Sequence, residues 1–223
     1  MSRASENRRL WLPQFWPAHA GLALFRLATK LPWPAQRALA LGRGVILLTA
    51  HCTTLEICGR MMTDQFKIGC LYRDPNNPVI AAQMRAQRER RMAIAVHFDD
   101  LKNLIRALRA GYAIWYAPDQ GKRTKQTEIL PFFGVPAITN TATGKLAEMT
   151  GAPVVPYFAR REPDHTYTLT ILPPLENFPT ADASADAIRI NQLIEHHVRL
   201  APAQYLWVHR RFKARGPGYA EVY

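Results

Sequence analysis

The feature that most constrains the fold is a short apolar segment, residues 45–50, that ends at a histidine and precedes a helix-compatible segment. It opens with Val-Ile-Leu-Leu, and such an uninterrupted aliphatic run predicts a parallel strand buried on both faces. His51 follows the strand, and Thr53, Thr54 and Glu56 open the next segment. Because ligands of open α/β sheets bind at the carboxyl ends of strands, the sequence predicts a functional site at His51.

Glu56 lies in the first turn of the predicted helix, where its carboxylate could reach back to one imidazole nitrogen of His51. That contact would fix the tautomer and leave the other nitrogen free as a general base. Thr53 and Glu56 also match a capping box, in which the two side chains bond helix N–H groups. A histidine near a helix start is more often a polar loop residue than a catalyst, so the rest of the chain decides between these interpretations.

The composition is that of a globular protein with an anionic partner. The 223 residues are 48% hydrophobic and 21% charged, enough for one substantial core. Lys and Arg number 29 against 17 Asp and Glu, and this formal charge of +12 favours nucleic acid, an acidic membrane surface or an acidic substrate. Cys52, Cys58 and Cys70 form no CxxC pair and indicate a reducing compartment. We expect neither a metal site nor a cofactor.

Residues 1–40 predict a membrane-interface helical segment that precedes a domain over residues 41–223. An amphipathic or hydrophobic helix is expected over about residues 18–30, with cationic residues around it. Three tryptophans flank it: Trp11, Trp16 and Trp33. An ordinary helix docked on the domain is the alternative. Residues 1–9 are polar and predict no signal peptide, and no apolar run reaches the roughly 18–20 residues of a spanning helix.

Strands and helices alternate along the rest of the chain, which predicts an α/β fold with a mostly parallel central sheet and helices on both faces. Further strands are predicted over residues 66–72, 113–117, 154–159 and 167–172, the last with the alternation of an edge strand. Helices are predicted over residues 79–91, 99–110, 141–150 and 183–200. The Gly and Pro residues of 130–137 favour a rigid, irregular loop with two exposed or pocket-lining aromatic side chains.

Three strand ends carry charged or titratable side chains toward one edge of this sheet. Arg73 follows one predicted strand and Asp119 another, and both are expected beside His51. This convergence favours catalysis over a structural role for His51. The arginines of the 79–91 helix suit either a solvated face or a phosphate-binding surface. Because that helix lacks aromatic residues, nucleic-acid binding is not expected.

Five motifs in this order resemble those of the bacterial lipid A late acyltransferases, the lauroyl and myristoyl transferases of the lysophospholipid acyltransferase superfamily. The motifs are His51-x4-Glu56, Tyr72-Arg73 with Asn77-Pro78, Pro118-Asp119-Gln120, Pro131-Phe-Phe-Gly-Val-Pro-Ala137 and the closing Gln204–Lys213 segment. The resemblance covers about residues 42–215 and implies a glycerolipid-acyltransferase-like α/β fold.

The resemblance implies an O-acyltransferase at the cytoplasmic face of the inner membrane. It would move a fatty acyl chain from acyl carrier protein to a hydroxyl of a phosphorylated, already acylated glycolipid, the lipid A precursor. His51 matches the family's general base and Glu56 the acid that orients it, while Arg73 and Asp119 match substrate-binding positions. The loop that shapes the acceptor pocket matches four further residues: Phe132, Phe133, Gly134 and Pro136.

Base catalysis fits this chemistry, because the acceptor hydroxyl must lose its proton as it attacks the thioester. The oxyanion would be stabilised by N–H groups at the helix start or by Arg73. An acyl intermediate on Cys52 is the less favoured route, since no second base is evident to activate the thiol.

The segment at residues 38–44 joins the expected N-terminal helix to the first strand almost directly, where family members normally carry several tens of residues. A truncated relative that binds lipid without turnover is therefore one alternative. Another glycolipid acceptor, or acyl-CoA as the donor, is the other.

Overall fold

A computed structural model describes residues 44–63, 68–213, 215, 218–220 and 222–223. The interface segment and the helix expected within residues 1–40 lie outside the described residues. In order, the elements are β1 (Val45–Leu48), α4 (Leu55–Thr63), β2 (Ile68–Tyr72), α5 (Pro78–Arg91), β3 (Ile94–His97), α6 (Leu101–Arg109), β4 (Ala113–Tyr116), β5 (Thr127–Phe132), β6 (Val135–Asn140), α7 (Ala142–Thr150), β7 (Val154–Arg161), β8 (Tyr167–Ile171), α8 (Ala183–Leu200), η2 (Pro202–Gln204) and η3 (Trp207–His209).

A mostly parallel, six-stranded sheet forms the centre of the molecule, as the alternating pattern predicts. Its strand order is β3-β2-β4-β1-β7-β8, and only the β7–β8 pair is antiparallel. All four residues of β1 are buried, which agrees with its aliphatic sequence. β8 lies at the edge, as its alternation predicts. Because β1, β2, β3 and β4 run in the same direction, their carboxyl ends share one edge of the sheet.

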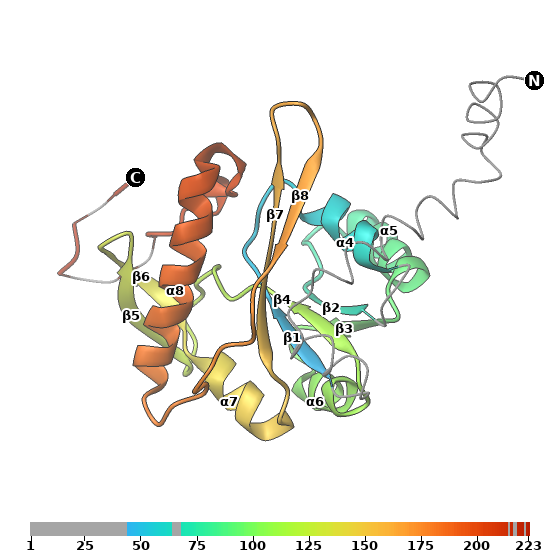
Figure 1. Cartoon of the computed structure of the whole chain (residues 1–223), viewed down its shortest axis with the longest axis horizontal. Coiled ribbons are helices and arrows are strands. Elements are labelled where there is room, and N and C mark those ends of the chain that lie inside the picture. The colour runs from blue at the N-terminus through green and yellow to red at the C-terminus, as the bar shows by residue number, and fades with distance from the viewer. Residues whose placement is uncertain (1–43, 64–67, 214, 216–217, 221) are drawn as a thin grey trace, which may run out of the picture.

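Helices cover both faces of the sheet, and the alternation of side chains along β1 divides the core in two. Ile46 and Leu48 pack with residues of α6, α7 and α8, whereas Val45 and Leu47 pack with Met62 of α4. Figure 1 shows α8 on one side of the strands and α4 and α5 on the other. Within the described residues, no helix has the length and apolar character needed to cross a membrane.

Two elements differ from the sequence-based expectation. Residues Ile94–His97 form a short strand, β3, parallel to β2, which no prediction included because four residues after a polar helix give little periodicity. Residues 130–137 are not an irregular loop, because they belong to the antiparallel β5–β6 hairpin. Its two-residue turn has positive φ at both Phe133 (51°) and Gly134 (74°), the pattern of a type I′ hairpin turn.

Candidate active site

His51 and Asp119 lie together at the carboxyl edge of the sheet, where β1 and β4 end side by side. The pairing of these strands extends one residue further, since the Thr49 N–H donates to the Tyr116 carbonyl at 3.0 Å. Both loops therefore leave the sheet from neighbouring positions. The two side chains are 68 positions apart in the sequence, and the parallel register brings them into contact.

One carboxylate holds His51 at two points. Nδ1 of the imidazole lies 2.6 Å from Asp119 Oδ1, and the His51 backbone N–H donates to Oδ2 at 3.0 Å. The Asp119 side chain is 1% exposed, whereas the His51 side chain is 26% exposed. Asp119 thus holds the imidazole from inside the protein through Nδ1. The other ring nitrogen, Nε2, does not contact this carboxylate.

The electrostatics keep Asp119 ionised. Burial by itself raises the pKa of this carboxyl, but hydrogen bonds from the His51 side chain and backbone, the imidazolium charge and a hydrogen bond from the Tyr205 hydroxyl lower the pKa below its usual value. An ionised carboxylate accepts from Nδ1–H, which places the free lone pair of a neutral imidazole on Nε2. This is the tautomer that a general base requires.

Residues 204–206 clamp the His51 loop from the other side. The Thr53 N–H donates to the Gln204 carbonyl at 2.8 Å, and the Leu206 N–H donates to the His51 carbonyl at 3.0 Å. Tyr205, which is 4% exposed, forms a β-bridge with Cys52. Its pKa is raised, by burial first and by the nearby Asp119 charge second. From the sequence, this segment is recognisable only as a motif, and no role is predicted for it.

Arg211 anchors the segment that carries the clamp. It is 2% exposed, donates to the Thr139 hydroxyl at 3.1 Å, and lies 4.8 Å from the centre of the Phe132 ring. Burial lowers the pKa of this guanidinium. The β5–β6 hairpin therefore supports the catalytic loop indirectly, through Arg211 and Tyr205.

Glu56 occupies the first turn of α4 and is exposed. Among the described residues, its carboxylate has no hydrogen bond to His51. Glu56 borders an apolar cavity whose other walls include Cys70 and Trp115. Burial raises the pKa of the Cys70 thiol to about 11. The orienting role expected for Glu56 stays a prediction.

Trp115 connects this cavity with the imidazole, because the two rings meet edge to face with centroids 6.0 Å apart. The N–H groups of Thr53 and Leu55 already donate to carbonyls. These two donors at the helix start are therefore engaged and do not form the oxyanion site considered from the sequence.

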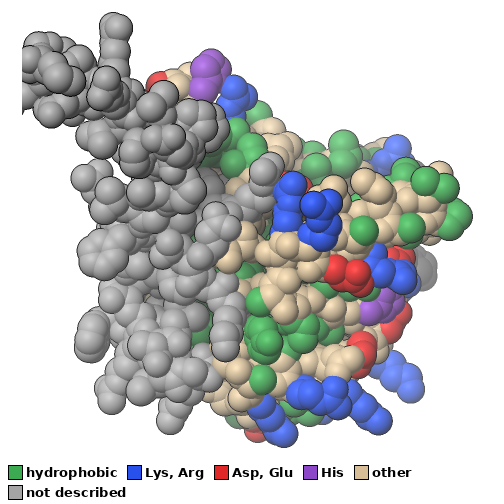
Figure 2. Space-filling view, turned by 90° about the vertical axis from the view of Figure 1, so that its right-hand side faces the viewer, with side chains coloured by type: hydrophobic (Ala, Val, Ile, Leu, Met, Phe, Trp, Pro, Cys, Tyr) green, Lys and Arg blue, Asp and Glu red, His purple; other side chains and the backbone are tan. Residues whose placement is uncertain are grey.

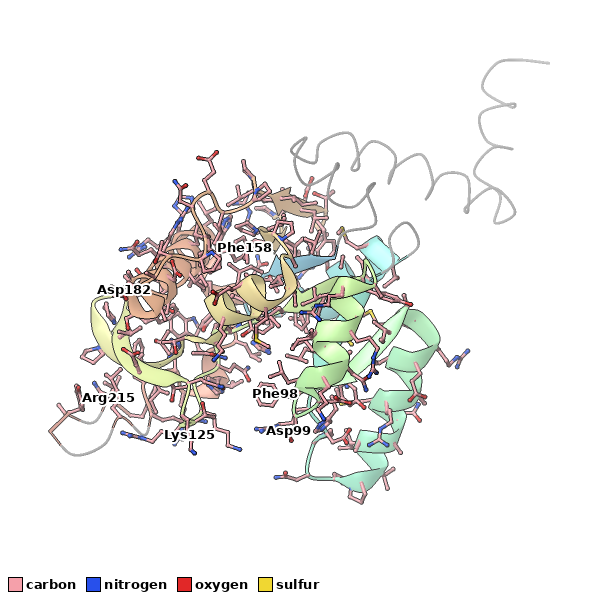
Figure 3. The ribbon with its side chains drawn as sticks, turned by 90° about the horizontal axis from the view of Figure 1, so that it is seen from below. Phe98, Asp99, Lys125, Phe158, Asp182 and Arg215 are labelled. Atoms are coloured by element: carbon pink, nitrogen blue, oxygen red, sulfur yellow. The ribbon has the colours of Figure 1, made fainter. Side chains whose placement is uncertain are left out.

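Arg73 follows β2 at the same edge of the sheet and is exposed. Its guanidinium lies over the Phe98 ring, 5.1 Å from the ring centre. Figure 3 shows Phe98 and Asp99, which follow β3, beside each other, with Lys125 of the β4–β5 loop facing them in the view. The carboxyl ends of β2 and β3 thus present one exposed cation, Arg73, and one exposed aromatic ring, Phe98.

The hairpin residues expected at an acceptor pocket have different environments. Phe132 is 0% exposed, so the expectation of an exposed or pocket-lining ring is wrong for this residue. Phe133 is half-buried at the turn, with the Arg199 guanidinium 4.6 Å from its ring centre. Gly134 completes the turn, and Pro136 pairs with Pro131 across the hairpin. Their roles in substrate binding stay predictions.

The described residues contain no cluster of three or more His, Cys, Asp or Glu side chains that could hold a metal ion. The titratable pair that the structure brings together at this edge is His51 and Asp119, with Nδ1 and Oδ1 2.6 Å apart.

Comparison with known proteins gives one consistent set of relatives. The sequence model of the bacterial lipid A biosynthesis acyltransferases matches residues 34–214. The chain is 38% identical over 183 residues to the lipid A biosynthesis lauroyltransferase of Escherichia coli K12, covering 81% of this chain and 60% of that protein. It is 34% identical over 190 residues to the palmitoleoyltransferase of the same organism, covering 84% and 62% respectively. Identity to the myristoyltransferase is 31% over 183 residues, covering 80% and 56%. The chain therefore spans roughly three fifths of the length of these relatives.

Proposed function

The chain belongs to the bacterial lipid A biosynthesis acyltransferases, and from this premise we propose that it transfers a fatty acyl chain to a hydroxyl of a lipid A precursor. Family membership agrees with the resemblance drawn from the five motifs. The observation that carries the proposal is the 2.6 Å contact between His51 Nδ1 and the buried carboxylate of Asp119, at the edge of the sheet where ligands bind.

In the proposed mechanism, His51 Nε2 removes the proton of the acceptor hydroxyl as the oxygen attacks the thioester carbonyl. Asp119 holds the imidazole in the required tautomer and stabilises the imidazolium that forms, because its carboxylate accepts from Nδ1–H. The imidazolium then supplies the proton that the departing thiolate needs. The carbon–sulfur bond breaks as the new ester bond forms, so no enzyme nucleophile is required.

Arg73 is the proposed contact for the anionic part of a substrate. It is exposed at the end of β2, and its cation–π contact with Phe98 holds the guanidinium at the sheet edge without a carboxylate partner among the described residues. A planar guanidinium binds phosphate through two parallel hydrogen bonds. Phe133, Gly134 and Pro136 remain candidates for the acceptor side of the site.

Acyl carrier protein is the proposed donor, and the cytoplasmic surface of the inner membrane is the proposed location. The formal charge of +12 suits both an acidic carrier protein and anionic lipid. Figure 2 shows Lys and Arg side chains beside apolar ones on the face turned to the viewer. Exposed apolar residues near the carboxyl edge include Val79, Ile80, Phe98 and Leu101. This combination of exposed apolar and cationic side chains suits a membrane interface.

The test is acyl transfer from a carrier-protein thioester to a lipid A precursor in mixed micelles. We expect the parent chain and His165→Ala to transfer, and His51→Ala to lose transfer while it remains folded. His165 is a matched control because it is an exposed histidine on the β7–β8 turn.

The donor is tested in the same assay by replacing the carrier-protein thioester with the CoA thioester, which we expect to be the poorer substrate. A folded parent chain that binds the micelles without transferring would overturn the proposal and favour a lipid-binding relative. Transfer that survives in His51→Ala would remove His51 from the mechanism.

A further inference from the structure

The closing segment of the chain holds a buried tyrosine against the catalytic pair. Tyr205 is 4% exposed and directly follows the short helix η2. Its hydroxyl donates to the carboxylate of Asp119, which also accepts from Nδ1–H and from the backbone N–H of His51. A carboxylate offers about four acceptor positions, so Asp119 can hold these three donors at once. The tyrosine hydroxyl is thus the third donor on the group that orients the proposed base.

The surroundings of Tyr205 fix the place of this hydroxyl. Its backbone forms a β-bridge with Cys52 of the catalytic loop. The side-chain amide of the preceding Gln204 bonds both backbone groups of Arg161 in β7, at 2.9 and 2.8 Å. The Tyr205 ring meets the Trp207 ring edge to face, with centroids 4.8 Å apart. Contacts of this kind, made by a supporting segment, hold a side chain in one orientation at a functional site.

The hydroxyl acts on the charge of Asp119. Burial raises the pKa of this carboxyl, but the hydrogen bonds from His51 and Tyr205 lower it below its usual value. Burial first, and the Asp119 charge second, raise the pKa of Tyr205, so its hydroxyl keeps its proton and stays a donor wherever an imidazole titrates. Negative charge that Asp119 shares with this donor attracts the imidazolium less strongly. The coupled pair therefore takes up a proton at a lower pH than it would without the hydroxyl.

Other ionisable groups act on this site through space. They are Cys52 beside Tyr205, and His209 and Arg211 near Asp119. Burial first, and the charge of Lys213 second, lower the pKa of His209. The buried guanidinium of Arg211 favours the ionised form of Asp119. All of these side chains remain in Tyr205→Phe, so a comparison of this variant with the parent isolates the hydroxyl.

We propose that Tyr205 is a positioning residue for acyl transfer, whose hydroxyl holds the Asp119 carboxylate against His51 and keeps the pair free of a proton down to a lower pH. Tyr205 acts only through Asp119 and does not contact the reacting atoms. This inference rests on the proposed function, because it assigns the closing Gln204–Lys213 motif a part in the proton transfer by His51.

The first test is an NMR titration of the histidine ring C–H signals in the full chain. The His51 signal is identified by its absence from His51→Ala. Tyr205→Phe keeps the aromatic ring and removes only the hydroxyl. We expect the titration midpoint of the His51–Asp119 pair to rise by about 0.5–1 pH unit, since one hydrogen bond to the charged carboxylate is lost and its effect is shared by two coupled groups.

Tyr116→Phe is the matched control. Tyr116 is buried like Tyr205, and it ends β4, the strand that leads to Asp119. Its hydroxyl lies 3.4 Å from the Thr143 hydroxyl and 3.5 Å from the Asn140 amide. This variant therefore loses a buried hydroxyl that contacts other partners, and we expect its midpoint to equal that of the parent. If Tyr205 served packing alone, both variants would lower the stability in urea and neither would move the midpoint.

The pH dependence of kcat/KM gives a second readout, because its acid limb reports protonation of the base in the free enzyme. The same shift predicts that kcat/KM of Tyr205→Phe falls about three- to tenfold on the acid limb and changes little on the plateau. An unchanged midpoint, or an equal loss of rate at every pH, would contradict the proposal. The NMR titration needs no substrate, so a folded parent that transfers no acyl chain counts against the proposed function, while the midpoint still decides the role of Tyr205.

Discussion

Replacing Asp119 by Asn tests which carboxylate orients His51. The Asp119 side chain accepts from both Nδ1–H and the backbone N–H of His51. In Asp119→Asn, the backbone N–H must still face an acceptor, so the amide oxygen takes that place and the amide NH₂ faces Nδ1. Nδ1 then becomes the acceptor, and the imidazole proton moves to Nε2. The nitrogen that should remove the substrate proton is blocked.

The expected loss is large in rate and small in stability. A wrong imidazole tautomer lowers kcat by about 10⁴ in a serine-protease triad, where an aspartate likewise accepts from the histidine Nδ1–H. Both hydrogen bonds persist in Asp119→Asn, and only the additional strength that the carboxylate charge gives them is lost. We expect this loss to lower the unfolding free energy by about 1–2 kcal/mol.

The assay measures acyl transfer in mixed micelles together with urea unfolding of each variant. Glu56→Gln is the matched comparison, because Glu56 is exposed and has no hydrogen bond to His51 among the described residues. We expect Glu56→Gln to retain at least a tenth of the parent activity. The opposite order, with Asp119→Asn active and Glu56→Gln inactive, would refute the assignment and restore Glu56 as the orienting acid.

Three further predictions concern stability. Phe132→Ala should lower the unfolding free energy by about 3–5 kcal/mol, since the ring is fully buried. Phe133→Ala should lower it less, because the Phe133 ring is only half-buried, and urea denaturation of both variants checks this. His197 takes up a proton at its ordinary pKa of 6.5 when unfolded but only at about 4 when folded, so stability should fall as the pH drops through that window. This pKa difference corresponds to a loss of about 3 kcal/mol of unfolding free energy, which solvent screening of the half-exposed ring reduces to about 1 kcal/mol. The unfolding free energy of His197→Leu should not show this loss between the two pH values. Gly121→Ala should destabilise by about 1–3 kcal/mol because its Cβ would overlap a backbone carbonyl of β6, while Gly59→Ala, with no contact closer than 3.6 Å, should be tolerated; equal melting temperatures would contradict this.

The pattern of elements was readable from the sequence to a large extent. The aliphatic run of β1 and the 18-residue helix α8 appear where the sequence predicts them. These features depend on side-chain periodicity over neighbouring residues, which is a local property. The β5–β6 hairpin was missed because Phe133 holds a positive φ that favours glycine or asparagine, so the residues at the turn gave no clear hairpin signal.

The sequence alone also determined which strand ends carry titratable side chains, and five motifs in order led to the family. His51, Arg73 and Asp119 do lie at one edge of the sheet, because parallel strands share a carboxyl edge. Only the tertiary structure decided which carboxylate meets His51. Glu56 is five positions away and, among the described residues, has no hydrogen bond to His51, while Asp119 is 68 positions away and in contact.

The clamp by Tyr205, the support from Arg211 and the partnerless nitrogen of His197 are equally products of the tertiary structure. Each arises where segments far apart in the chain pack together, and burial then sets their charge and hydrogen bonding. A sequence specifies residue types and their local periodicity directly. It specifies long-range contacts only through the folded core, and the chemistry of this site depends on those contacts.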